Sequence, residues 1–472
     1  MLTIDHRSAL STRVGAHGID PEVFAVDSDA SVRAQKLTET LESRRNTGWE
    51  GWRGLPFDPA RSAHVAAINE AVTKRAGNFD NLVVLGIGGS ALGNIALQSA
   101  LNTYTYNLLP DDLRPGPRVF VVDNVDPAYL KSVLDVCHQT DPGLKRTLFN
   151  VISKSGETAE TAAQFMTIRQ MLVGALGEKE HAKNILAITD AEKGTMRAIC
   201  NDNGYDTLPV PEGVGGRFSV LSPVGLFSAA MAGIDIDALL NGAADMDRRC
   251  STPTLADNPA AHLATILHTL GERGKNNHVM MPYCNALYLM ADWFRQLWAE
   301  SLGKLHDLDG KEVFAGYTPI KALGTTDQHS QAQLYREGPN DKVFMFLEVG
   351  DFEGDDLTIP DETLADPLSY LQGQKFSKLL NAEKRATEYA FIESGRPSVT
   401  INFPSVNAYH VGQFIYLFEM VTAYTGLMLN VDAYDQPAVE TGKVATFGLM
   451  GREGYGEWKE KVEKALGGDI TV

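Results

Sequence analysis

The chain has 472 residues and a formal net charge of -18, with 44% hydrophobic and 22% charged residues. This composition is typical of a globular protein, and the acidity argues against broad nucleic-acid binding, which needs a basic surface. No apolar run approaches the roughly 18 residues that a membrane-spanning helix needs. The four cysteines stand far apart without a C-x-x-C pair, which favours a reducing compartment. We therefore expect a cytoplasmic protein that does not associate with membranes.

Residues 1–75 form a first segment that is polar and mostly helical in pattern. A repeating strand–loop–helix pattern follows, in which short apolar runs end in polar loops. These runs predict strands at residues 82–87, 119–122, 148–152, 185–188 and 208–210. Such alternation is typical of a parallel sheet that helices cover on both faces. We assign residues 76–234 to this first domain.

The same pattern restarts in the second half of the chain. Predicted strands at residues 278–281, 342–349 and 398–403 alternate with helices, so we expect a second, similar domain over residues 235–425. Residues 426–472 have a helical pattern and form the last segment. The predicted fold class is α/β, with two doubly wound parallel-sheet domains of three αβα layers, flanked by N-terminal and C-terminal helical segments.

Polar loops follow the predicted strands, at the edge where open α/β sheets bind ligands. The first loop, GIGGS at residues 86–90, has small residues with free N–H groups, and Gly89 and Ser90 open a helix where an anion can bind. With Ala91 the loop also satisfies a relaxed dinucleotide fingerprint, and Asp123 ends the next strand, where a ribose-binding acid would lie. A glycine turn that serves only tight packing is a further alternative.

The loop at residues 153–158 is more specific. It reads SKSGET, and it places the hydroxyls of Ser153, Ser155 and Thr158 between a buried strand and a helix, together with the amine of Lys154. These donors can surround a phosphate. Helix capping is the alternative, because Ser and Thr are favoured at helix starts. Capping accounts for one hydroxyl and not for three, so the pattern favours phosphate binding.

Arg217 and Glu300 are two further charged residues that could act on a substrate. Arg217 ends a glycine-rich loop at residues 213–217 and can stabilise negative charge on a substrate oxygen, although a surface arginine in a turn is an alternative. Gln296 and Glu300 share one face of a helix over residues 285–302 that is otherwise apolar and aromatic. A carboxylate in a buried helix is costly unless it is paired or functional. Glu300 is therefore a candidate general base, unless it lies on an outer face of the helix.

Two polar loops in the second half of the chain add His329 and Lys443. His329 closes the GTTDQH loop at residues 324–329, and it is the one histidine beside other polar motifs. Lys443 follows a turn at residues 435–436, and a lysine drawn to a helix C-terminus is the alternative for it. No cluster of His, Cys and acidic residues has the spacing of a zinc site, so we predict no metal.

Taken in order, these motifs resemble those of the glucose-6-phosphate isomerase family, within the sugar-isomerase (SIS) domain superfamily. The resemblance runs from about residue 79 to residue 443. The segments that carry it are LGIGGSALG (85–93), SKSGETAET (153–161), VGGRFSVLSPVG (214–225), QLWAESLGK (296–304), GTTDQH (324–329) and DQPAVETGK (435–443). Six segments in the same order form a specific signal.

The resemblance implies an aldose–ketose isomerase that interconverts glucose 6-phosphate and fructose 6-phosphate through a cis-enediol(ate), with no metal and no cofactor. It implies that Glu300 moves a proton between C2 and C1, that Arg217 stabilises the enediolate and that Gln296 positions the substrate. His329 and Lys443 would assist ring opening. The residues implied in binding the sugar and its phosphate are Gly89, Ser90, Ser153, Lys154, Ser155 and Thr158.

The resemblance also implies a homodimer with the active site between the two domains, and we expect the partner subunit to supply His329. Two functions of other classes stay open on the residues alone. The glycine fingerprint with Asp123 suits a nicotinamide-dependent dehydrogenase, which would change NADH fluorescence on binding. A phosphosugar sensor without catalysis would need the phosphate loop but not Glu300, His329 or Lys443.

Overall fold

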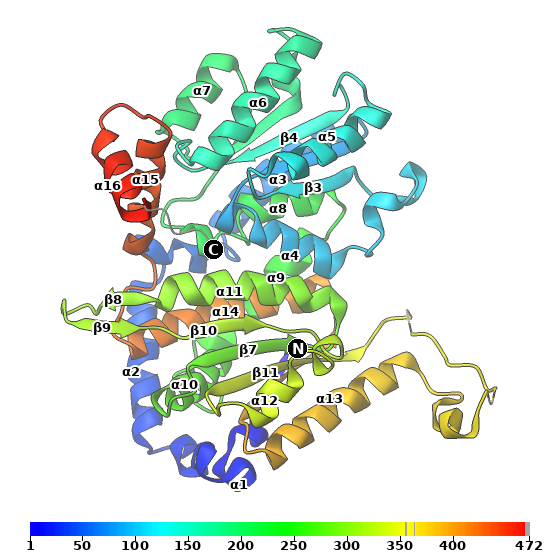
Figure 1. The fold of residues 1–472 in the computed structure, drawn as a ribbon, viewed down its shortest axis with the longest axis vertical. Coiled ribbons are helices and arrows are strands. Elements are labelled where there is room, and N and C mark those ends of the chain that lie inside the picture. Colours follow the sequence, from blue (N-terminus) through cyan, green and yellow to red (C-terminus); the bar gives the residue numbers. More distant parts are fainter. Residues whose placement is uncertain (355, 363, 468–472) are drawn as a thin grey trace.

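Two parallel sheets organise the chain in this computed structural model, which describes residues 1–354, 356–362 and 364–467 (Figure 1). The first sheet has five parallel strands in the order β3-β2-β4-β5-β6. Each strand corresponds to an apolar run predicted from the sequence. Their bounds are β2 (Asn81–Leu85), β3 (Arg118–Val122), β4 (Thr147–Ile152), β5 (Ile185–Thr189) and β6 (Asp206–Pro209).

Helices cover both faces of the first sheet because successive side chains of a strand point to opposite faces. Val83 and Phe149 pack in a core cluster with Phe165, on the face covered by α5 (Pro127–Thr140), α6 (Ala159–Leu176) and α7 (Thr195–Asn203). Val84 and Leu148 belong to a second cluster on the other face. The helices there are α3 (Ala60–Arg75), α4 (Leu92–Leu101) and α8 (Pro223–Met231).

The second sheet has the order β1-β12-β11-β7-β10, in which only β1 is antiparallel. Its strands are β1 (Thr3–Asp5), β7 (Asn277–Pro282), β10 (Thr318–Lys321), β11 (Lys342–Asp351) and β12 (Ser398–Ser405). Three of them were predicted, whereas β1 and β10 were not. Phe344 and Phe391 share a small core on the face of α12 (Ala332–Glu337) and α13 (Phe376–Glu393).

A shared helical layer joins the two sheets. The helix α11 (Tyr288–Leu302) contacts α4 of the first domain and α14 of the second, and Figure 1 places it between the sheets. One hydrophobic cluster accordingly runs from Leu97 in α4 through Trp298 in α11 to Phe418 in α14. The other helices of this layer are α9 (Ile236–Cys250), α10 (Pro259–Glu272) and α14 (Ala408–Met428). The two domains therefore share a core, and the predicted α/β fold class is confirmed.

The terminal segments pack on these domains. The N-terminal segment contains α1 (Ser11–Val14) and α2 (Asp29–Arg44), and α2 packs on α10 and α14. Near the C-terminus, α15 (Glu440–Leu449) packs against α16 (Gly456–Leu466). The predicted helical pattern at residues 468–472 lies outside the described residues. The domain boundaries at residues 75, 234 and 425 stay a proposal.

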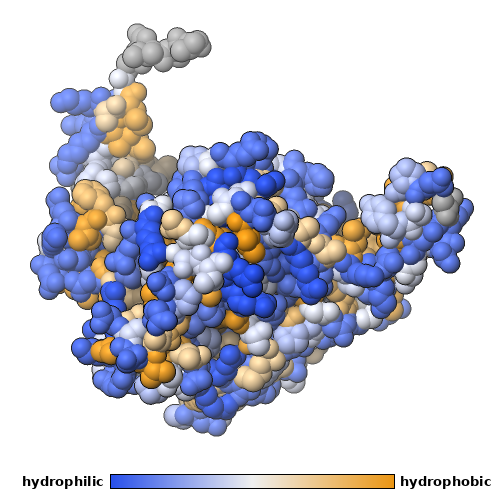
Figure 2. All heavy atoms as spheres, turned by 90° about the horizontal axis from the view of Figure 1, so that it is seen from below, coloured by the Kyte–Doolittle hydropathy of each residue, from blue (hydrophilic) through white to orange (hydrophobic). Residues whose placement is uncertain are grey.

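An arm of irregular chain between β11 and α13 extends away from the body (Figures 1 and 2). The exposed apolar side chains of this arm are Leu357, Leu364, Leu368 and Tyr370. A short hairpin of β8 (Lys304–His306) and β9 (Glu312–Ala315) follows α11.

The face in Figure 2 is largely hydrophilic, with apolar residues in small groups. Among the described helices, none is both long and apolar enough to cross a membrane.

Candidate active site

A cavity of about 960 Å³ lies at the carboxyl ends of the first sheet, where it meets α11 and the C-terminal segment. The loops after β2, β4, β5 and β6 contribute to its wall, because parallel strands end at the same edge of a sheet. The structure brings ten of the eleven predicted site residues to this cavity. They are Gly89, Ser90, Ser153, Lys154, Ser155, Thr158, Arg217, Gln296, Glu300 and Lys443.

The glycine loop after β2 lies in direct contact with the loop after β6. Gly88 has a φ of 58°, which favours glycine, and it opens a short 3-10 helix, η5 (Gly88–Ser90). A Cβ atom on Gly89 would lie 2.2 Å from the carbonyl oxygen of Gly216. Only glycine at position 89 therefore allows the two backbones to approach so closely, and this approach places Arg217 beside the loop after β2.

The SKSGET loop joins β4 to the N-terminus of α6, where helix N–H groups favour an anion. The hydroxyl of Ser153 accepts a hydrogen bond from the backbone N–H of Gly156 (3.0 Å), and that of Ser155 accepts one from Glu157 (3.2 Å). Thr158 is the N-cap residue of α6, but its side chain makes no capping hydrogen bond. Capping is therefore the wrong explanation for Thr158, which lines the cavity without that role.

The loop after β5 supplies two residues that the sequence reasoning missed. Asp190 and Lys193 line the cavity close to the SKSGET loop. The backbone N–H of Asp190 donates to the carbonyl of Lys154 (3.3 Å). The signal was present, since Thr189 and Asp190 directly follow the strand predicted at residues 185–188. The rule that ligands lie at strand ends applies to that loop as well.

Arg217 is buried at the base of the cavity and is held from three sides. It donates to the hydroxyl of Ser301 (2.9 Å), the side chain of Gln436 (2.8 Å) and the carbonyl of Ala433 (2.9 Å). Burial lowers the pKa of its guanidinium, and the negative charges of Glu300 and Asp435 oppose that shift. The alternative of a surface arginine in a turn is therefore wrong.

Glu300 and Gln296 lie on the face of α11 that lines the cavity. Glu300 accepts a hydrogen bond from the side-chain amide of Gln296 (3.0 Å). Its other carboxylate oxygen lies 3.5 Å from a guanidinium nitrogen of Arg217, and its side chain is 27% exposed. Glu300 is therefore neither enclosed in the core nor turned outward. It lies on the cavity wall as a carboxylate paired with a buried cation.

The C-terminal segment completes the wall. Lys443 is exposed and pairs with Glu440 at 2.6 Å in the first turn of α15. The alternative that Lys443 is drawn to a helix C-terminus is therefore wrong. Lys304, which sequence reasoning did not single out, is buried below the site. Its amine donates to the backbone carbonyls of Glu300 (2.9 Å), Ser301 (2.9 Å) and Asp435 (3.0 Å), and so joins the end of α11 to the C-terminal segment.

His329 is the one predicted site residue that does not line this cavity. It is exposed and follows η11 (Thr326–Gln328). The side-chain amide of the neighbouring Gln328 donates to Tyr283 (2.7 Å) and to the carbonyl of Glu383 (3.1 Å), which fixes the loop to the second domain. Within the described residues, no group of three or more His, Cys, Asp or Glu side chains is placed to hold a metal ion.

Comparison with known proteins identifies the family. The sequence pattern of the family described as phosphoglucose isomerase matches residues 66–451. The chain belongs to the phosphoglucose isomerase family. A protein named glucose-6-phosphate isomerase from Carboxydothermus hydrogenoformans is 44% identical over 441 residues, which cover 93% of each chain. One of the same name from Rubrobacter xylanophilus is 42% identical and covers 96% of this chain and 99% of its own.

Solved structures share the fold of this chain over nearly its whole length. A crystal structure of a hypothetical protein from Thermus thermophilus superposes with a TM-score of 0.81 at 34% identity, covering 96% of this chain and all of that chain. A glucose-6-phosphate isomerase from Chlamydia trachomatis has a TM-score of 0.80 at 22% identity, over 98% of this chain and 92% of its own, and supports the fold. The family match and the two named relatives confirm the predicted resemblance.

Proposed function

We propose that this chain is a glucose-6-phosphate isomerase, which interconverts glucose 6-phosphate and fructose 6-phosphate in glycolysis and gluconeogenesis. Membership in the phosphoglucose isomerase family and the names of its relatives support this activity. One observation of the site carries the mechanism. Glu300 and Arg217 lie 3.5 Å apart on the wall of the same cavity that the SKSGET loop lines.

The phosphate end of the substrate binds at the SKSGET loop. Ser153, Ser155 and Thr158 provide hydroxyls, Lys154 provides a cation, and the N-terminus of α6 provides backbone N–H groups. Gly89 and Ser90 line the side of the cavity where the sugar lies. Because the phosphate does not react, its binding energy can hold C1 and C2 against Glu300.

The isomerisation moves protons only. Glu300 takes the proton from C2 of the open-chain aldose, which gives the cis-enediolate with its negative charge on O1. Arg217 stabilises the negative charge on the oxygens of this intermediate, and Gln296 positions it. The O2 proton then passes to O1, and Glu300 returns its proton to C1, which gives the ketose. Lys443 and His329 assist the preceding ring opening, by proton transfer between the ring oxygen and the C1 hydroxyl.

We further propose a cytoplasmic homodimer in which each subunit supplies His329 to the site of the other. His329 is exposed and absent from the cavity of its own chain, which supports a role across an interface. The arm between β11 and α13 supports association as well, because its Leu357, Leu364, Leu368 and Tyr370 side chains are exposed to solvent. The four cysteines are free and buried, as suits a reducing compartment.

The test of this function replaces Glu300 by Gln, which keeps the shape of the side chain and removes its basicity. We expect turnover of fructose 6-phosphate in a coupled assay to fall by roughly two to four orders of magnitude, as is usual for a general base. Exchange of the C2 hydrogen in deuterated water should fall equally, while the substrate still binds. The matched control is Glu337→Gln on the exposed end of α12. Near wild-type exchange in the Glu300 variant would remove this residue from the mechanism.

A further inference from the structure

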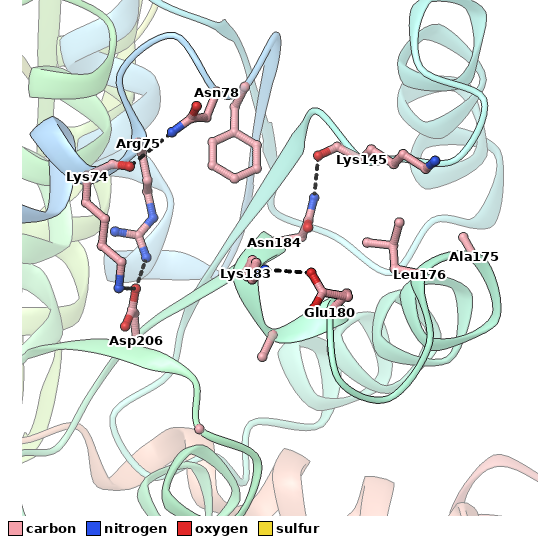
Figure 3. A pocket seen from close by; sticks show the side chains of 13 residues that line it. Lys74, Arg75, Asn78, Lys145, Ala175, Leu176, Glu180, Lys183, Asn184 and Asp206 are labelled. Carbon is pink, nitrogen blue, oxygen red and sulfur yellow. Dashed lines mark hydrogen bonds and ion pairs between the residues drawn. The ribbon is translucent and has the colours of Figure 1, made fainter.

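A second cavity, of about 750 Å³, lies at the opposite edge of the first sheet (Figure 3). Its wall includes Asp206, the first residue of β6, and Asn184, which immediately precedes β5. The end of α3, the end of α6 and the 3-10 helix η8 (His181–Asn184) complete it. This cavity shares no residue with the active-site cavity, which is built at the other ends of the same strands.

The wall of this cavity is cationic, although the chain as a whole carries a net charge of -18. Four lining side chains are basic and two, Glu180 and Asp206, are acidic. The basic ones are Lys74, Arg75, Lys145 and Lys183. A local excess of positive charge on an acidic protein attracts small anions to that place.

The two acidic side chains of the cavity do not neutralise its four basic side chains. Lys74 and Arg75 both donate to the same carboxylate oxygen of Asp206, each at 2.6 Å, so one carboxylate faces two cations. The buried Nε of Arg75 has no hydrogen-bond partner among the described residues. Lys183 pairs with Glu180 at 2.6 Å. Lys145 also lines the cavity, and in Figure 3 its amine points away from Lys74 and Arg75. This amine has no ion pair within the described part of the chain.

Part of the cavity wall is apolar. Phe79, Leu176, Ala175 and Ala182 line the cavity beside the charged groups. Pockets for small organic ligands typically measure about 300–1,000 Å³ and combine apolar surface with a few polar groups. An inorganic anion would use only the cations, whereas an organic anion with a flat apolar body would use both kinds of surface.

We propose that this cavity binds a nucleoside phosphate, with its phosphates on Lys74 and Lys145 and its base against the apolar wall. Binding is independent of the substrate, because the two cavities open at opposite edges of the sheet. It is also independent of the isomerase activity, so a failure of one proposal leaves the other standing.

The experiment titrates the full chain with ADP in a calorimeter, in the presence of saturating fructose 6-phosphate to occupy the active site. We expect one ADP per chain. The variant Lys74→Glu with Lys145→Glu reverses the charge of the two lysines that are proposed to hold the phosphates. It should weaken ADP binding at least about tenfold. Both side chains are exposed, and Arg75 keeps its bond to Asp206, so the variant should fold.

The matched control is Lys131→Glu with Lys459→Glu, which makes the same change in net charge at exposed lysines of α5 and α16. It should leave ADP binding unchanged. Pyrophosphate and adenosine should each bind at least about tenfold more weakly than ADP. The proposal is overturned if no ADP binds beside the substrate, if the two double variants behave alike, or if pyrophosphate binds as tightly as ADP.

Discussion

Lys304 offers a sharp prediction because it joins the helix of the candidate base to the segment that carries Lys443. Its amine donates to three backbone carbonyls, those of Glu300, Ser301 and Asp435, from a buried position. Burial lowers the pKa of this amine, and the nearby charge of Arg217 lowers it further. Lys304→Met keeps most of the length of the side chain and removes all three donors.

The expected cost follows from these contacts. A hydrogen bond from a charged group contributes about 1.5–3 kcal/mol, and removal of the donor leaves carbonyls unpaired. Methionine offsets part of this loss in the free energy of unfolding, because the variant no longer buries a charged amine. We therefore expect a loss of about 2–4 kcal/mol in the free energy of unfolding. Since the end of α11 and residues 433–436 lose their common anchor, kcat should fall about tenfold while KM changes less.

The assay combines denaturant unfolding with steady-state kinetics on fructose 6-phosphate. Lys304→Arg should restore part of both losses, because a guanidinium can still donate to these carbonyls. The control is Lys311→Met, at an exposed lysine next to the β8–β9 hairpin. Destabilisation with an unchanged kcat would leave Lys304 a purely structural role, and no change in either quantity would refute the reasoning.

Three further predictions concern the site. Ser155→Ala with Thr158→Ala should raise KM for the phosphosugar and weaken inhibition by inorganic phosphate, and an unchanged KM would exclude the loop as the phosphate site. Gly89→Ala should cost about 1–3 kcal/mol and reduce kcat, because a Cβ there meets backbone of the facing loop at 2.2 Å; unfolding and rate measurements check it. Random mixing of His329→Ala with Glu300→Ala subunits should recover about a quarter of wild-type activity, provided that His329→Ala alone is impaired, and no recovery would confine the site to one chain.

The sequence predicted the first domain well because its strands are continuous apolar runs with polar loops at their ends. The strand predicted at residues 148–152 is β4, and the SKSGET loop follows it as expected. The same rule, together with the family resemblance, pointed to the ten site residues that line one cavity. The rule that ligands lie at strand ends can be applied to a sequence wherever a buried strand is followed directly by a polar loop.

Features that depend on distant partners were missed for the opposite reason. The strand β1 has three residues and too short a pattern to recognise, and its pairing with β12 defines it. Lys304 reads as an ordinary lysine after a helix, and only the fold brings Asp435 to its amine. The position of His329 relative to a second subunit cannot follow from local pattern either, so its role stays a prediction.

The pairing of β1 with β12 has a consequence for how the protein is made. Thr3 and Asn402 are partners across the sheet, 399 positions apart in the chain. At the usual 5–20 residues per second of protein synthesis, the amino-terminal strand must wait roughly 20–80 s for its partner to emerge from the ribosome. During that interval the first domain can form its own sheet, while β1 stays unpaired. A chaperone that binds extended amino-terminal segments would therefore act on β1 during this interval.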